Sequence, residues 1–413
     1  MTRNAFASTA GAGHVTGQNA ARDAIRGAHS EAAPVPRSGP AGPVADGATV
    51  GCVPAAASGA GFRSVRVLRA GPVSLRFRPR ELLVAAVLTA ALLVAVTVHV
   101  ALGGTPIPFG QVLAALAGQP VEGGVGLVVT EFRAPRTVAA VLVGACLAAA
   151  GAIMQTVARN PLASPDILGV TSGASAGAVA VLVLAGSGAV GVAGLAASVG
   201  MPAAAFTAGL AAGVAVYLLA YRRGIDSYRL ILVGLGVDGL ATALTTWMLT
   251  LGDVTNAAQA LTWMTGSLNG KDWPLVLPLG AAAAVLLAAA VAAGRWLLLG
   301  ALDRDTAVAI GLRLGRVGLL SLTLAVLLAA VATVVGGRVV FVALASPQIA
   351  RLLTGSPVPP VAVSALVGAV FVLVSDAVAA NLFATPLPVG VVTAVLGAPY
   401  LIYLVMRPPR RTS

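Results

Sequence analysis

The stretch from Arg133 to Gly177 reads RAPRTVAAVLVGACLAAAGAIMQTVARNPLASPDILGVTSGASAG, and it decides the fold. Two arginines open a long apolar run, and a polar turn that contains prolines follows it. A second apolar run then carries Gly169, Gly173 and Gly177 at intervals of four residues. Small residues at this spacing let helices approach closely where lipid supplies no hydrophobic drive between them. The stretch therefore predicts membrane helices in close contact.

The composition extends this interpretation to most of the chain. Of the 413 residues, 58% are hydrophobic and 10% are charged, and the mean hydropathy is +0.94. Soluble domains carry about 25% charged residues, so a polytopic membrane protein is predicted. The net charge of +12 does not indicate a nucleic-acid surface, because the arginines flank apolar runs rather than line one face. Three scattered histidines and two cysteines lack metal-ligand spacing, so no metal site and no cofactor are expected in this chain.

The N-terminal residues 1–80 differ from the remainder. They are rich in Ala, Gly, Pro and Ser without a sustained apolar period, which predicts a disordered basic arm. The first long apolar run starts near Leu82, too late for a signal peptide, so the arm is expected to be retained. Arginines crowd the approach to this run and are expected to hold the arm in the cytoplasm. A membrane domain, 81–407, and a cytoplasmic tail, 408–413, complete the predicted organisation.

Ten membrane-spanning helices are predicted after the arm, since about 20 apolar residues cross the hydrocarbon layer. The predicted spans are 82–102, 136–157, 167–186, 200–221, 229–251, 274–298, 316–335, 339–353, 361–378 and 389–406. With both termini in the cytoplasm, twelve basic residues after the first span lie inside and four lie outside. The four outside are Arg133, Arg136, Lys271 and Arg338. An odd number of spans would put the basic C-terminal tail outside, so ten spans are favoured.

The turn between the second and third spans is predicted, with the glycine ladder, to serve helix packing and gating. Its residues Asn160, Pro161 and Pro165 precede the three glycines named above. A substrate path lined by glycine is the alternative use of the ladder. The hexapeptide LASPDI at 162–167 also recurs as LASPQI at 344–349, as an inverted repeat of transporter type would give.

Two acidic residues fall within predicted spans, Asp238 in the fifth and Asp376 near the outer end of the ninth. Intramembrane carboxylates are costly and are candidates for function, but a helix–helix hydrogen bond explains Asp238 equally well. A proton-coupled carrier usually needs a relay of such groups, and two are too few. The stretch 266–272 also fails as a phosphate-binding loop, since it is one residue short and has Asp in place of the magnesium-binding Ser or Thr. The chain is therefore expected not to be an enzyme, and another chain would hydrolyse any ATP.

The longest predicted cytoplasmic connection is 300–316, GALDRDTAVAIGLRLGR. Asp303 and Asp305 stand at the start of a possible short helix, where acidic residues favour the helix dipole. Ala307, Ile310 and Leu314 fall on one side of this helix. The pattern fits either an amphipathic helix on the membrane surface or a docking helix for a cytoplasmic partner.

Together these stretches resemble the permease subunits of ABC importers for ferric siderophores, haem and vitamin B12, the FecCD-type family. The motifs that carry the resemblance are RAPR at 133–136, GAIMQ at 151–155, RNPLA at 159–163, PDILG at 165–169, WMTGSL at 263–268, FVALASP at 341–347, LPVG at 387–390 and LGAP at 396–399. The resemblance covers nearly all of 81–407 in order and leaves out the arm.

The resemblance implies a type II ABC importer permease fold with ten helices in the bacterial cytoplasmic membrane. Two permeases side by side would work with two cytoplasmic ATPases, which bind the ATP and Mg, and with an outer binding protein that delivers the ligand. Arg133 and Arg136 match arginines that dock the binding protein, and interfacial anchoring is the alternative. The family's coupling helix corresponds to the 300–316 connection, and its predicted residues are Leu302, Asp303, Arg304, Asp305, Ala309 and Gly311.

The chain departs from the family pattern at three positions. Gln348 stands where many relatives have His, Ala380 where many have a third docking Arg, and Pro386 where a Glu is common. The third docking arginine is therefore not carried over. The PQIAR form at 347–351 resembles one of two paralogous permeases of ferric enterobactin-type importers, so a ferric siderophore and a different second permease are expected. A haem or cobalamin permease is the close alternative, and an ion-coupled secondary carrier or a membrane scaffold is more remote.

Overall fold

The computed structural model describes residues 66–406, except for 71–72, 78, 104–105, 122, 186–199, 221–226, 252–253 and 303. The chain divides into two units, 1–62 and 63–413, and all described residues belong to the second. Most of the predicted arm and the whole predicted tail 408–413 therefore lie outside the described residues.

The described chain begins with a two-stranded hairpin. Strands β1 (Arg66–Ala70) and β2 (Val73–Phe77) pair antiparallel, with Arg66 opposite Phe77 and Ala70 opposite Val73. Short runs that contain Val, Leu and Phe, next to Gly or Pro, favour strands. The hairpin differs from the disordered arm that the sequence predicts up to residue 80, because two such runs follow one another just before the first span.

Each of the ten predicted spans coincides with a helix. Among the described residues, seven helical segments are long and apolar enough to cross a membrane. These segments contain α2 (Pro79–Ala101), α5 (Ala134–Val157), α8 (Met201–Ala220), α9 (Ser227–Leu251), α11 (Trp273–Gly300), α13 (Leu314–Gly336) and α15 (Val361–Asn381). The three shorter helices are α6 (Val170–Ala185), α14 (Val342–Thr354) and α16 (Val389–Met406). The predicted class, an all-helical polytopic membrane protein, is confirmed apart from the hairpin.

Short helical segments connect or extend the long ones. They are α3 (Phe109–Leu116), α4 (Val125–Leu127), the π-helix η2 (Val128–Arg133), the 3-10 helix η3 (Pro165–Leu168), α10 (Val254–Thr265) and α12 (Arg304–Ala309). Segments α4 and η2 continue directly into α5 and make one helical run of 33 residues, Val125–Val157. π-Helical turns are frequent at functional sites, and this one carries Arg133 to the start of α5.

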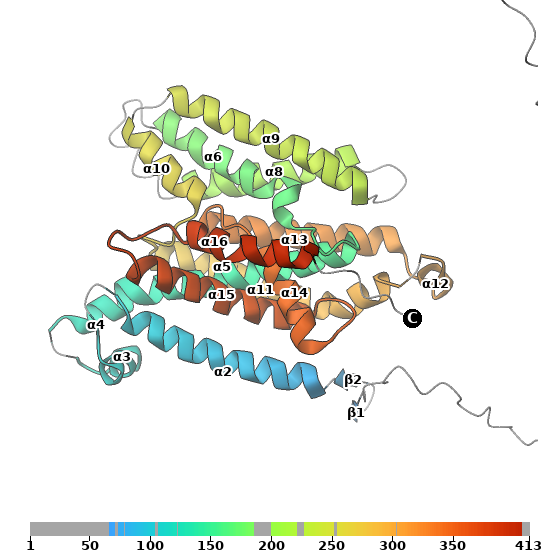
Figure 1. Ribbon diagram of the computed structural model, residues 1–413, viewed down its shortest axis with the longest axis horizontal. Helices are drawn as coiled ribbons and strands as arrows, with labels where there is room; N and C mark the ends of the chain where they lie inside the picture. Colours follow the sequence, from blue (N-terminus) through green and yellow to red (C-terminus); the bar gives the residue numbers. More distant parts are fainter. Residues whose placement is uncertain are drawn as a thin grey trace, which may run out of the picture. The chain divides into compact units, whose positions relative to one another are not determined.

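Helix α5 lies inside the bundle and is buried along nearly its whole length. It packs against α11, α13, α14 and α15 (Figure 1). A Cβ atom on Gly144 would collide with the carbonyl of Gly368 in α15, and one on Gly151 with the carbonyl of Ala343 in α14. Glycine at these two positions therefore sets how closely the neighbouring helices approach.

A buried amide pair holds α14 against α5. Gln348 Nε2 donates to Gln155 Oε1 at 2.6 Å, and Gln155 Nε2 donates to the Leu344 carbonyl at 3.0 Å. The 13 residues of α14 rise only about 20 Å, too little to cross the hydrocarbon layer alone. The amide pair thus anchors a helix that is embedded in the protein. It also gives Gln348, one of the departures from the family pattern, a structural role.

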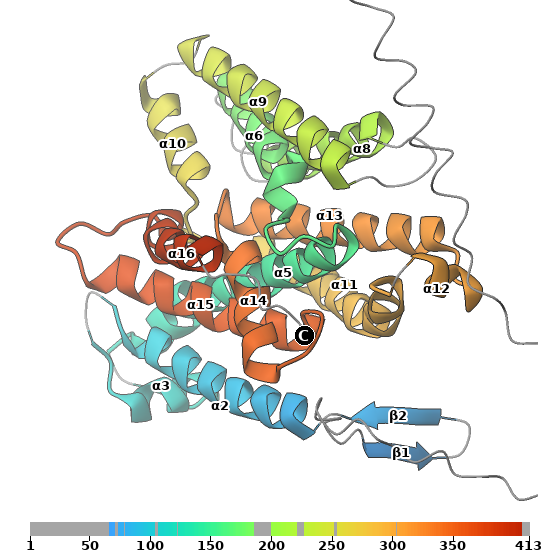
Figure 2. The same cartoon turned by 45° about the vertical axis from the view of Figure 1, so that its right-hand side comes forward.

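Helices α6, α8, α9 and α10 form a second group beside α5 and α13 (Figure 2). The glycine ladder lies at the contact of α6 with α8. A Cβ on Gly173 would press on the Ala212 side chain, and one on Gly177 would collide with the Ala204 carbonyl. Gly169 differs, because it has a φ of +66° and packs against α9 at Val237. Gly173 and Gly177 allow close helix contact, and Gly169 allows a left-handed turn.

The turn at 158–169 leads back from the end of α5 into the bundle. The carbonyl of Ile167 occupies the space that a Cβ on Gly234 would need, and Gly234 lies about 10 Å along α9 from the first residue of that helix. Helix α6 begins directly after this contact, inside the bundle. Its 16 residues are fewer than the roughly 20 that a full span needs. The hexapeptide at 162–167 is a turn followed by a 3-10 helix, whereas its repeat at 344–349 lies inside α14. The two copies therefore do not share a conformation.

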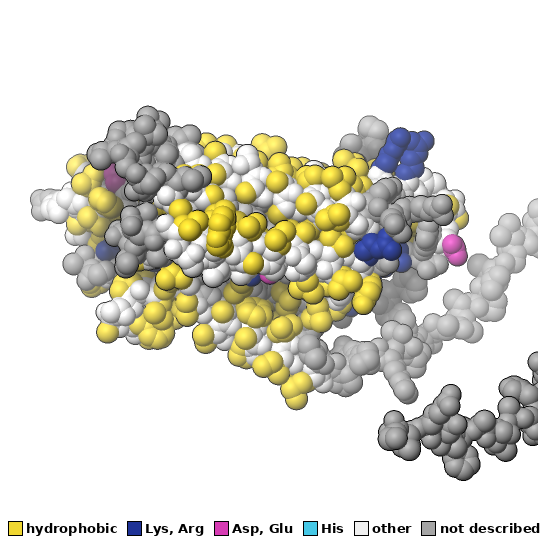
Figure 3. All heavy atoms as spheres, turned by 90° about the horizontal axis from the view of Figure 1, so that it is seen from above, with side chains coloured by type: hydrophobic (Ala, Val, Ile, Leu, Met, Phe, Trp, Pro, Cys, Tyr) yellow, Lys and Arg dark blue, Asp and Glu magenta, His cyan; other side chains and the backbone are white. Residues whose placement is uncertain are grey.

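The bundle has two ends, which we name by the residues that lie there. We call the end with Ala101 and Arg133 the arginine end, and the end with Val157 and Gly300 the α12 end. Hydrophobic side chains spread over the flank between them, and Lys and Arg side chains gather towards one end (Figure 3). Arg80 contacts the Leu353 carbonyl at 2.7 Å, and both belong to segments that were predicted to share the cytoplasmic side.

Candidate functional sites at the two ends of the bundle

A buried ion pair joins α5 to α15 at the arginine end. Arg136 donates to both carboxylate oxygens of Asp376, from Nε at 2.7 Å and from Nη2 at 2.9 Å. The side chain of Asp376 is 1% exposed and that of Arg136 is 24% exposed. Such a bidentate pair fixes both distance and direction. It holds the beginning of α5 against the last turns of α15.

His99 of α2 extends this pair to a third helix. Its Nε2 lies 2.9 Å from Asp376 Oδ2 and its Nδ1 lies 2.8 Å from Thr137 Oγ1. The Thr137 hydroxyl also donates to the Arg133 carbonyl at 2.8 Å, so Thr137 links the imidazole to the backbone at the end of η2. Helices α2, α5 and α15 therefore meet at one charged cluster.

Arg133 is also held within the chain. Its Nη1 donates to the carbonyls of Val100 and Ala101 at the end of α2, at 2.9 and 3.0 Å, and the Ala101 carbonyl also accepts from the Ile107 amide at 3.1 Å. The two arginines predicted to dock a binding protein thus share one end of the bundle, and each already has acceptors in this chain. Docking through them stays a prediction, and for Arg136 it requires the Asp376 carboxylate to share or release the guanidinium.

A second charged group lies farther inside, between the two groups of helices. Asp238 of α9 is 3.6 Å from the Arg338 guanidinium, and both side chains are about a quarter exposed. The Arg338 residue belongs to the connection between α13 and α14. The helix–helix hydrogen bond offered as the alternative use of Asp238 is not seen among the described residues, because its Oδ1 has no hydrogen-bond partner and Arg338 lies in a connection.

The predicted coupling segment forms a short exposed helix at the α12 end. Helix α12 begins at Arg304 as expected, and Asp303 lies outside the described residues. Ala307 is fully buried, whereas Val308 and Ile310 are 56% and 55% exposed. The prediction that Ala307 and Ile310 share one side differs from this result, because the helix ends at Ala309 before Ile310. The remaining predicted coupling residues are Leu302, Asp305, Ala309 and Gly311, and all four are exposed.

The polar turn after α5 is shaped by its own side chains. Asn160 Oδ1 accepts from the Leu162 amide at 2.9 Å, an Asx turn that fixes the chain around Pro161. Pro161 and Leu162 are exposed, whereas Pro165 is buried at the start of η3. The turn therefore has an exposed tip at the α12 end and a buried stem against α9. Its predicted gating role stays a prediction.

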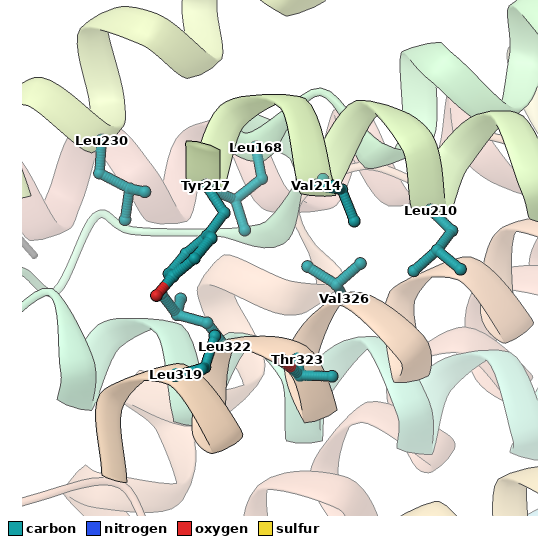
Figure 4. A pocket seen from close by; sticks show the side chains of 10 residues that line it. Leu168, Leu210, Val214, Tyr217, Leu230, Leu319, Leu322, Thr323 and Val326 are labelled. Carbon is teal, nitrogen blue, oxygen red and sulfur yellow. The ribbon is translucent and has the colours of Figure 1, made fainter. Parts of the chain in front are cut away.

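An apolar cavity lies between α8, α13 and the start of α9 (Figure 4). Its volume is about 120 Å³, and its walls include Leu168, Tyr217 and Leu322. Pockets that enclose drug-sized ligands measure about 300–1,000 Å³, so this cavity does not house a large chelate.

The fold defines a polytopic membrane permease with a short exposed helix at one end. The sequence model of the FecCD transport family matches residues 91–407, and the chain belongs to this family. It is a multi-pass protein of the bacterial cytoplasmic membrane. The resemblance drawn from the sequence motifs is thereby confirmed.

Three curated relatives give the family likeness detail. The ferric enterobactin transport system permease protein of Escherichia coli is 38% identical over 66% of this chain and 80% of its own length. The achromobactin transport system permease protein of Dickeya dadantii is 38% identical over 76% and 84%. A siderophore transport system permease protein of Bacillus subtilis is 40% identical over 61% and 73%. A solved structure described as an inward-facing metal-chelate type ABC transporter matches 78% of this chain and 98% of its own, with a TM-score of 0.67 and 26% identity.

Proposed function

We propose that this chain is the membrane-spanning permease subunit of an ATP-driven importer that moves a ferric siderophore across the cytoplasmic membrane. The observation that carries the proposal is the likeness, at 38–40% identity, to permeases named for ferric enterobactin, achromobactin and siderophore transport. The enterobactin-type PQIAR pattern at 347–351 supports the same ligand class.

Energy for transport comes, in this proposal, from separate cytoplasmic ATPases that bind ATP and Mg. The sequence offers no phosphate-binding loop for either ligand. The exposed apolar side chains of Val308 and Ile310 on and just after α12 suit a groove on such a partner. Two copies of the ATPase would serve two permeases.

The ligand path runs, in this proposal, between this chain and a second permease, which we expect to be a different paralogue. One face of α9 supports the idea, since Gly236 and Gly239 are exposed and a Cβ on either would meet nothing within 4 Å. A second permease or the ligand path would cover this face. A substrate-binding protein outside the cell would bring the chelate to the arginine end, where Arg133 and Arg136 are its candidate contacts.

Uptake of radiolabelled iron tests the proposal in cells with and without this chain. Ferric enterobactin, ferric achromobactin, ferric hydroxamates and ferric citrate form the panel, and labelled haem and cobalamin are the controls. We expect deletion to abolish uptake of one siderophore class and to spare both controls. Loss of only haem or cobalamin uptake would agree with the family but would overturn the proposed siderophore ligand. Normal uptake of every compound, in a strain without a second importer, would overturn the transport role.

A further inference from the structure

The side chain of Arg159 hydrogen-bonds to two backbone carbonyls between α11 and α12. Its Nη2 donates to the Leu302 carbonyl at 2.6 Å and to the Gly300 carbonyl at 3.2 Å. Gly300 ends α11, and Leu302 lies two residues before α12. The side chain therefore bridges the turn after α5 and the segment that carries α12.

The backbone at Arg159 is unusual for an arginine. Its φ is +49°, and among the described residues only Phe341 is a second non-glycine residue with a positive φ. The position follows the last turn of α5, where the Asn160 amide donates back to the Gln155 carbonyl at 3.2 Å. Glycine is the residue that fits this helix-ending position without steric penalty. An arginine here keeps a strained backbone in exchange for a side chain that glycine lacks.

The chain after Arg159 runs through an exposed tip at Pro161 and Leu162 and is buried over residues 163–165 before it meets α9. Asn160 closes the turn on itself through the Leu162 and Ala163 amides, at 2.9 and 3.1 Å. Farther on, the Ile167 carbonyl fills the notch at Gly234 so fully that no Cβ would fit there. A displacement of the buried stem of the turn is therefore transmitted to the first third of α9.

We propose that Arg159 is a positioning residue that transmits movement of the α12 segment to the turn and, through it, to α9. The proposal rests on the proposed function, in which a partner ATPase displaces α12. Hydrogen bonds to the last residue of α11 and to Leu302, two residues before α12, make Arg159 follow that displacement. The contact of Ile167 with Gly234 then carries the displacement to α9. The exposed face of α9 with Gly236 and Gly239 is the one that a second permease or the ligand path would cover.

A purely structural role is the competing explanation. Carbonyls at the end of a helix lack partners, and an arginine that caps α11 stabilises it. Capping predicts that loss of the side chain lowers stability, ATP hydrolysis and transport together. Transmission predicts that hydrolysis continues while transport falls.

The two roles are separated in the full complex, reconstituted in liposomes with its ATPase, second permease and binding protein. Arg159→Gly removes both hydrogen bonds and relieves the positive φ, so the backbone is not the cause of any loss. Arg159→Lys keeps a donor, and Arg351→Ala removes an exposed arginine of α14 as the matched control. ATP hydrolysis and uptake of radiolabelled ferric enterobactin, with ferric achromobactin as second probe, are measured in the same vesicles.

For Arg159→Gly we expect uptake to fall by about tenfold or more, since lost charge-assisted hydrogen bonds change a rate by at least that factor. ATP hydrolysis should stay within about twofold, Arg159→Lys should restore part of the uptake, and Arg351→Ala should behave as wild type. Uptake within twofold of wild type for Arg159→Gly overturns the inference. So does a parallel loss of hydrolysis and uptake with a lower melting temperature, which identifies a cap. Failure of the wild-type complex to import either chelate with ATP would instead count against the proposed function.

Discussion

Replacing Asp376 with Asn tests the charged cluster that joins α2, α5 and α15. The carboxylate accepts from Arg136 Nε, Arg136 Nη2 and His99 Nε2, at 2.7, 2.9 and 2.9 Å. Asn has nearly the same shape, but it keeps one acceptor oxygen and turns an NH₂ group towards donors. The substitution therefore removes the negative charge that pairs with the Arg136 guanidinium and places an NH₂ group against one of its donors.

The magnitude follows from the bonds that are lost. A hydrogen bond to a charged group contributes about 1.5–3 kcal/mol. Oδ2 accepts two of the three bonds, so an Asn whose oxygen takes its place loses the bond from Arg136 Nη2 and the charge of the pair. Water reaches the Arg136 side chain, which is 24% exposed, and replaces part of the loss. Breaking one side of a buried pair costs about 3–5 kcal/mol, so we expect a loss near the lower limit, about 3 kcal/mol.

Thermal unfolding of the detergent-purified chain measures this loss. We expect the midpoint of Asp376→Asn to fall by about 5 °C or more. Asp305→Asn, an exposed carboxylate on α12, is the control and should leave the midpoint unchanged. The double variant with Arg136→Gln should lose less than the sum of the single variants, because the pair acts as a unit. A midpoint within 1 °C of wild type for Asp376→Asn would refute the reasoning.

Three further predictions concern other parts of the bundle. Asp238→Asn should leave ATP-dependent iron uptake within about twofold of wild type, because the Arg338 contact at 3.6 Å is too long for a hydrogen bond; abolished uptake would favour the ion-coupled carrier. Gly144→Val should lower stability by about 3 kcal/mol, because its side chain would collide with the facing carbonyl of α15. Gly236→Ala, with free space at its Cβ, should not, and equal thermal unfolding midpoints for the two variants would contradict the packing argument. Val308→Asp should reduce co-purification of the ATPase by about tenfold if α12 docks it, since a charge would then enter an apolar contact, and unchanged recovery would exclude docking through this side chain.

The membrane helices could be predicted because each carries its own signal. A span of about 20 apolar residues follows from the thickness of the hydrocarbon layer, and flanking arginines mark its ends. The predicted span 339–353 coincides with α14, whose 13 residues are too few to cross alone. The apolar residues of α14 are buried inside the protein rather than in lipid, and the Gln155–Gln348 hydrogen bond holds this helix against α5.

The candidate sites were harder to predict, because their partners are far apart in the chain. Arg136 and Asp376 are separated by 240 residues, and His99 and Asp376 by 277. The sequence marked Asp376 as unusual but held no indication of which basic groups it meets. The sequence gives Arg159 a place in the RNPLA motif and among the cytoplasmic charges, but a bond to the Leu302 carbonyl leaves no trace in residue type. Coarse roles of segments follow from motifs, whereas side-chain partners follow from packing.

The central claim is that this chain conducts a ferric siderophore at the expense of ATP hydrolysed by a partner. The most direct measurement is uptake of radiolabelled ferric enterobactin and ferric achromobactin by liposomes that hold the complete complex, with the binding protein outside and ATP inside. We predict uptake of one chelate that requires ATP, requires this chain and persists when all ion gradients are collapsed. Uptake that follows an ion gradient without ATP, or no uptake of either chelate by an ATP-hydrolysing complex, would contradict the account.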